Sequence, residues 1–95
     1  MKWIEIIEFR SFNTDDALLE LDFLNQLAKA TKEVNIEAIS IYNHSTLNTD
    51  VSIHVQHNSA QVESQGSPLG LRLVSELKTF GFVNHTVWVE KRRLK

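Results

Sequence analysis

Four segments of the chain carry the apolar and polar pattern of β-strands, and two carry that of amphipathic helices. In the strand segments, apolar and polar residues alternate, or β-branched and aromatic residues dominate. Alternation is expected because successive side chains of a strand point to opposite faces of a sheet. The predicted strands are Lys2–Phe9, Ile36–Tyr42, Val51–Gln56 and Val83–Glu90.

The two helix segments are marked by their first residues as well as by their apolar spacing. The first begins at the polar run Asn13–Asp16, whose oxygen-bearing side chains suit the N-terminus of a helix. The second begins at Ser67, is followed by Pro68 at the first helical position, and is expected to end at Gly81. The apolar stripes are Ala17, Leu21, Leu24 and Ala28 in the first helix and Leu73, Val74, Leu77 and Phe80 in the second.

The order strand, helix, strand, strand, helix, strand predicts an α+β, ferredoxin-like βαββαβ fold. Right-handed crossovers through both helices give a four-stranded antiparallel sheet of order 4-1-3-2, with both helices on one face. If residues 45–48 form the turn of the hairpin, Ile41 pairs with Ile53. Ile39 then pairs with Val55, and all four side chains face the helices.

The face of the sheet opposite the helices is expected to be apolar and uncovered. Tyr42 and Trp88 lie on this face by their strand parity. The first strand adds either Trp3, Glu5, Ile7 and Phe9 or Ile4, Ile6 and Glu8. Because so much apolar surface is seldom left in water, we expect a homodimer in which two sheets pack face to face. Together with the fold, this is the arrangement of a dimeric α/β-barrel.

Composition is typical of one compact domain. The chain has 95 residues, 42% of them hydrophobic, and it lacks cysteine, which excludes disulfides and thiolate chemistry. No apolar run reaches the length of a membrane span and no signal segment is recognisable, so we expect a cytoplasmic protein. The net charge of −2 argues against nucleic-acid binding. We expect the basic residues 91–95 to form a frayed tail.

Polar residues from distant parts of the chain are expected to meet at one edge of the predicted sheet. Arg10, Asn13, His44 and Asp50 are the candidate ligand-binding residues, and His85 is expected in the same neighbourhood. An imidazole oriented by a carboxylate is the minimum arrangement for general base catalysis. Strand ends and turns also collect polar residues that have no function, and this alternative stays open.

The candidate catalytic residues are His85, His54, Tyr42, Trp88 and Asn84, chosen for their chemistry and approximate position. The parity of His85 places it on the helix side of the last strand, between apolar neighbours. It is therefore expected to be partly buried, either as a hydrogen-bonded core histidine or as a group that faces a ligand.

No metal site is predicted. His54 and His57 have the spacing of metal ligands, but residues three apart on a strand point to opposite faces. We expect His57 near Glu37 across the hairpin instead. The segment 65–70 has the glycines of an anion site at a helix N-terminus, but Ser67 favours an ordinary capped terminus.

Three functions remain open. We favour a ligand-binding or regulatory module that takes a small molecule. The element order also resembles, over most of the chain, the dimeric α/β-barrel proteins, and this resemblance implies a cofactor-independent oxygenase or isomerase without assigning catalytic residues. RNA binding through Tyr42 and Trp88 on the open face ranks last. No cofactor is expected, because the chain carries no nucleotide-binding or metal-binding motif.

Overall fold

Helices and strands follow one another in the predicted order. The structure is a computed structural model, and it describes residues 1–12, 22–30, 32–33 and 35–95. The elements in these residues are β1 (Lys2–Ser11), α1 (Asp22–Ala30), β2 (Ile36–Asn43), β3 (Asp50–Asn58), α2 (Pro68–Leu77) and β4 (Gly81–Val89). The predicted start of the first helix at Asn13–Asp16 lies outside the described residues.

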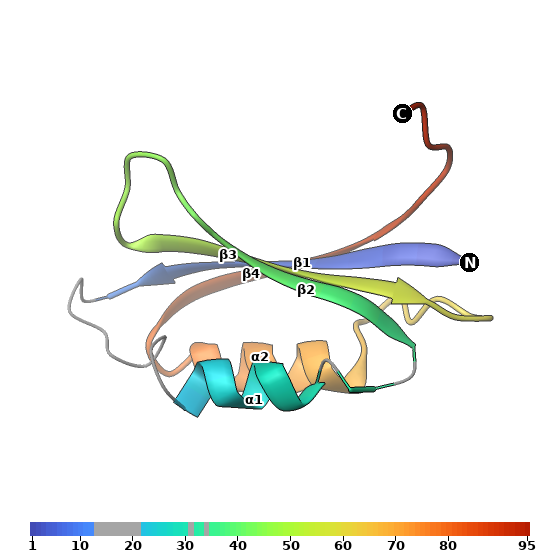
Figure 1. Cartoon of the computed structure of the whole chain (residues 1–95). Coiled ribbons are helices and arrows are strands. Elements are labelled where there is room, and N and C mark those ends of the chain that lie inside the picture. The colour runs from blue at the N-terminus through green and yellow to red at the C-terminus, as the bar shows by residue number, and fades with distance from the viewer. Residues whose placement is uncertain (13–21, 31, 34) are drawn as a thin grey trace.

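The strands form one antiparallel sheet in the described part of the chain, in the order β2-β3-β1-β4. Both helices pack on the same face, and no helix of the described residues lies on the opposite face (Figure 1). This is the predicted ferredoxin-like fold with its strand order. The hairpin register is also confirmed, with Ile39 opposite Val55 and Ile41 opposite Ile53.

The first strand turns Trp3, Glu5, Ile7 and Phe9 towards the helices. All four are buried, whereas the alternate positions on the strand are partly or fully exposed on the open face. Because β1 lies between β3 and β4, its helix-facing side chains form the middle of the core. The same core holds Leu27, Val51, Ile53, Val55, Leu69, Leu73 and Leu77.

The second helix begins as predicted and ends earlier. Ser67 is its N-cap, and the Ser67 hydroxyl accepts a hydrogen bond from the Gly70 amide at 3.1 Å. The last helical residue is Leu77, so the assignment of Phe80 to the apolar stripe was wrong. Phe80 lies between α2 and β4 and is 38% exposed.

Gly81 does not end the helix but opens β4, opposite Ser11 of β1. A Cβ atom at this position would lie 2.1 Å from the Arg10 carbonyl oxygen. Only glycine allows the two backbones to come this close, which explains the residue type better than the predicted helix end.

The open side of the sheet is bordered by two irregular segments. The β2–β3 loop rises on this side at one end, and the C-terminal tail rises on it at the other (Figure 1). The tail residues 90–95 are exposed. Across the described residues, no helix has the length and apolar character to cross a membrane.

Candidate functional site

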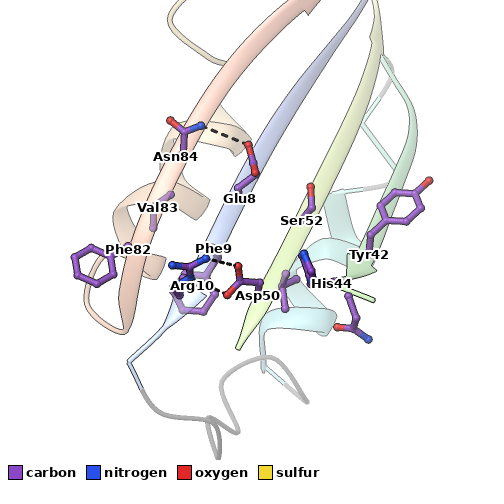
Figure 2. Close-up of a pocket in the computed structure, with 12 residues that line it drawn as sticks. Glu8, Phe9, Arg10, Tyr42, His44, Asp50, Ser52, Phe82, Val83 and Asn84 are labelled. Atoms are coloured by element: carbon purple, nitrogen blue, oxygen red, sulfur yellow. Dashed lines mark hydrogen bonds and ion pairs between the residues drawn. The ribbon is translucent and has the colours of Figure 1, made fainter. Parts of the chain in front are cut away.

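A pocket of about 360 Å³ lies on the open face, where β1 ends and β3 begins (Figure 2). Strands β1, β2, β3 and β4 all contribute to its walls. The side chains with functional chemistry or aromatic surface are Arg10, Tyr42, His44, Asp50, Phe82 and Asn84. Three of the four predicted ligand-binding residues therefore meet here, and the fourth, Asn13, lies outside the described residues.

Arg10 and Asp50 form a two-point ion pair across neighbouring strands. Nε and Nη2 of Arg10 donate to the two carboxylate oxygens of Asp50, each at 2.9 Å. The hydrogen bond to Arg10 lowers the pKa of Asp50, and the same bond raises the pKa of Arg10. Both groups are charged at neutral pH. Within the described residues, Nη1 of Arg10 has no hydrogen-bond partner, so it is available to an acceptor on a ligand.

His44 is held by its own turn. The backbone amides of Thr46 and Leu47 both donate to Nδ1 of His44, each at 3.1 Å. Because Nδ1 accepts these bonds, the proton of the neutral ring is on Nε2. Asn84 is oriented by a long hydrogen bond of 3.4 Å to Glu8. The pocket therefore presents hydrogen-bond donors on Arg10 and His44 and carboxylate oxygens on Glu8 and Asp50.

Four of the five candidate catalytic residues lie on the open face but do not form one group. The rings of His54 and Tyr42 are neighbours, with centroids 4.6 Å apart. Trp88 is further along the sheet, and its indole N–H donates to Thr86 at 2.9 Å. Of these candidates, only Tyr42 and Asn84 line the pocket.

His85, the fifth candidate, points to the other face. It pairs with Ile7 across β1 and β4, and its side chain is only 13% exposed on the helix side, which confirms the predicted parity and burial. The expected neighbourhood with Arg10 and His44 is wrong. The pocket uses the open face, and His85 lies on the opposite side of the same strand.

On the helix side, a buried cluster centres on the carboxylate of Glu5, which is fully buried. Nε2 of His57 lies 2.6 Å from Oε2, and Nε2 of His85 lies 3.0 Å from Oε1. The Ser67 amide donates to Oε1 at 2.9 Å, and the Ser67 hydroxyl donates to Oε2. Each carboxylate oxygen thus accepts two hydrogen bonds, and the four donors come from β3, β4 and the start of α2.

The contact expected between His57 and Glu37 is replaced by this cluster. His57 faces the helices, is 4% exposed, and stacks on the buried ring of Trp3 with centroids 3.9 Å apart. Glu37 instead accepts a hydrogen bond from the neighbouring residue Asn58 at 3.1 Å. The parity of β3 explains the difference, because adjacent residues of a strand point to opposite faces.

The start of α2 is a capped terminus, as predicted. It also binds an anionic side chain of the same protein. That anion is the Glu5 carboxylate, bound by the backbone and side chain of Ser67. Gly66 and Gly70 make room for it. A Cβ atom on Gly70 would lie 2.0 Å from Oε1 of Glu5, and one on Gly66 would lie 2.4 Å from Cε1 of His85.

Glu5 remains ionised in this setting. Burial raises the pKa of Glu5, but the hydrogen bonds from Ser67, His57 and His85 outweigh that effect and hold it below its ordinary value. Sequence reasoning missed the cluster. The available signal was Glu5 itself, a glutamate on the same face of the first strand as Trp3. It could be recognised as buried only once the helix-facing side of that strand was known.

The cluster is not arranged as a metal site. Both imidazoles contact the carboxylate, and the described residues contain no group of three His, Cys, Asp or Glu side chains able to hold a metal ion. The arrangement fits a carboxylate that orients imidazoles for proton transfer.

Comparisons with known proteins agree on the fold. No family model and no curated protein sequence matches the chain. Among solved structures, Rv0793 from Mycobacterium tuberculosis is similar over all of both chains, with a TM-score of 0.75 and 15% identity. SnoaB from Streptomyces nogalater, described as a cofactor-independent oxygenase, is similar over 98% of this chain and 96% of its own, with a TM-score of 0.72 and 10% identity. A SnoaB variant has a TM-score of 0.74. At these identities the likeness establishes the ferredoxin-like fold.

Proposed function

We propose that the chain is a homodimeric domain that binds a small, partly aromatic ligand in the pocket of the open face. The observation that carries this proposal is the position of the pocket. It lies on the sheet face opposite the two described helices, among exposed aromatic side chains, so a second sheet packed on that face would enclose it.

The open face has the surface expected of an interface. Tyr42 is 51% exposed and Trp88 is 59% exposed, and the partly buried Ile4 and Ile6 lie between them on the central strand. Large exposed apolar surfaces of this kind mark interaction sites. The β2–β3 loop and the C-terminal tail, which rise on the same side, would flank a second copy (Figure 1).

The pocket itself combines aromatic walls with oriented donors. Phe82, 68% exposed, and Tyr42 stand on opposite sides of it, on β4 and β2 (Figure 2). Nη1 of Arg10 and Nε2 of His44 can donate hydrogen bonds to an oxygen atom of a ligand. Such a site fits a flat molecule that carries hydroxyl or carbonyl groups.

The interface is tested by replacing Trp88. We expect light scattering at micromolar concentration to give a dimer for the wild type and a monomer for Trp88→Ala, because the change removes a large exposed ring from the proposed contact. Leu71→Ala is the matched control, since Leu71 is 50% exposed on α2, outside the open face. A monomeric wild type would contradict the proposal and would direct attention to RNA or a different protein on this face.

The ligand pocket is tested by NMR titration with 1-naphthol, a flat aromatic molecule with one hydroxyl group. We expect saturable shifts at Tyr42 and Phe82, and binding about tenfold weaker in Phe82→Ala because one aromatic wall is lost. Leu71→Ala should bind as the wild type does. Shifts spread over the whole surface, or equal affinity in Phe82→Ala, would argue against a specific pocket.

A cofactor-independent enzyme is the second candidate function. It is supported by Glu5, whose buried carboxylate orients two imidazoles, and by the likeness in fold to SnoaB. Proton abstraction by an imidazole needs no metal or organic cofactor.

A further inference from the structure

The packing of α2 on the sheet does not require the polar side chains of the Glu5 cluster. The surrounding helix-facing side chains are apolar, including Ile7, Ile53 and Val55. An apolar core of the same volume would stabilise the fold at least as well, because the desolvation free energy of buried charged groups cancels most of the free energy gained from their pairing. Titratable groups gathered in this way are found preferentially at functional sites.

Within the cluster, His85 is the group that reaches the surface. Its side chain is 13% exposed, compared with 4% for His57 and 0% for Glu5. It lies on β4, the edge strand next to β1, so no further strand of the described sheet covers its outer side. Nε2 is bonded to Glu5, and no described residue hydrogen-bonds to Nδ1.

The imidazole of His85 is also fixed in place. The loop before α2 brings Gly66 against the ring, so close that an added Cβ would overlap Cε1. The charged and titratable groups that face His85 from the described elements are Glu5 of β1 and, across the same carboxylate, His57 of β3. An oriented ring with one bonded and one unbonded nitrogen has the geometry of a general base.

We propose that His85 is a general base, oriented by Glu5, that removes a proton from a small carbon acid or enol bound at the β4 edge beside the loop before α2. This inference rests on the enzymatic candidate and is independent of the pocket on the open face. Glu5 is a positioning residue, since it is fully buried and meets the substrate only through His85.

The reaction step balances without a further reagent. The substrate C–H or O–H bond breaks, its proton goes to Nδ1 of His85, and the electron pair stays on the substrate as an enolate. Nε2–H of His85 keeps its hydrogen bond to Glu5, whose negative charge stabilises the imidazolium that forms. Return of the proton to another atom of the same substrate completes an isomerisation, with no net oxidation or reduction.

The test uses 5-nitrobenzisoxazole, a general probe for a positioned base. Removal of its ring C–H proton breaks the N–O bond and releases a coloured phenolate. We expect the wild type to accelerate this reaction and His85→Gln to lower the rate above background by about 100-fold, the low end of the usual contribution of a positioned base. Arg72→Gln is the control, because Arg72 is exposed on α2 and belongs to neither the cluster nor the pocket, and it should keep the wild-type rate.

The pH profile separates catalysis from a structural role. The pH dependence of the rate should coincide with the NMR titration of the His85 ring in the same sample, and folded Glu5→Gln should lower the rate. If His85→Gln fails to fold, the comparison of the wild-type pH–rate profile with the NMR titration of His85 still tests the proposal. A wild-type rate no higher than that of free imidazole at the same concentration, or one that follows another histidine, would overturn the proposal. Binding of 1-naphthol on the open face is measured separately and would be unaffected by that result.

Discussion

Glu5→Gln is expected to lower the free energy of unfolding by about 2–6 kcal/mol, because two buried donors lose their acceptor at a cost of about 1–3 kcal/mol each. The carboxylate accepts four hydrogen bonds, two on each oxygen, from Ser67, His57 and His85. Glutamine has the same shape, but its NH₂ group accepts none, so two donors lose their acceptor inside the core. Urea unfolding followed by circular dichroism measures the change.

Glu8→Gln is the control for this substitution. Glu8 lies on the same strand, is exposed on the opposite face, and accepts a long hydrogen bond of 3.4 Å from Asn84. We expect its effect to stay within about 0.5 kcal/mol. Equal losses in the two variants would mean that the buried hydrogen bonds of Glu5 contribute nothing specific to stability.

The stability that Glu5 contributes should disappear in acid. Its folded pKa lies below the ordinary value of 4.5, so the carboxylate is favoured by folding. The contribution is therefore fully present above pH 4.5 and is lost as the pH falls through the folded pKa. In unfolding experiments at decreasing pH, the difference between the wild type and Glu5→Gln should shrink as the pH falls below 4.5.

Gly70→Ala is expected to lower the free energy of unfolding by about 3 kcal/mol, from overpacking and strained hydrogen bonds to a charged group. This sign is opposite to the usual one, since alanine is favoured over glycine in a helix by about 1 kcal/mol. Here the added Cβ would lie 2.0 Å from Oε1 of Glu5. That carboxylate is fully buried and held in place by four hydrogen bonds. Thermal and urea unfolding measure the loss.

Ser75→Ala is the matched control for Gly70→Ala, because Ser75 lies on an exposed part of the same helix. We expect it to change stability little. Combining Gly70→Ala with Glu5→Ala should cost less than the sum of the two single changes, since Glu5→Ala removes the side-chain atoms that the new Cβ would meet. Additive losses would show that the clash is not with Glu5.

The sequence by itself determined the elements and their order. Alternation in Val51–Gln56 and the Ser67–Pro68 start of α2 are local patterns, and each fixes one element through the period or capping chemistry of that element alone. Handedness rules then left one sheet order, which the structure has. The register of the β2–β3 hairpin followed as well, because a short loop joins the two strands.

Local sequence patterns were less informative at residues whose type fits two different structural roles. Gly81 was read as a helix end, but it opens β4 because the Arg10 carbonyl comes too close for any side chain. The polar edge was anticipated in part, since Arg10, His44 and Asp50 do meet at the pocket. His85 was grouped with them wrongly, because nearness along a sheet edge does not distinguish its two faces.

The tertiary structure alone decided what surrounds Glu5. In sequence, Glu5 is 52 residues from His57, 62 from Ser67 and 80 from His85, so no local period links them. Both sides of the first strand are rich in apolar residues, and its alternation therefore did not say which side meets the helices. That choice was made by packing: the helices cover Ile7 and Phe9, and the Glu5 carboxylate on the same face is buried where two imidazoles and a helix N-terminus supply its hydrogen bonds.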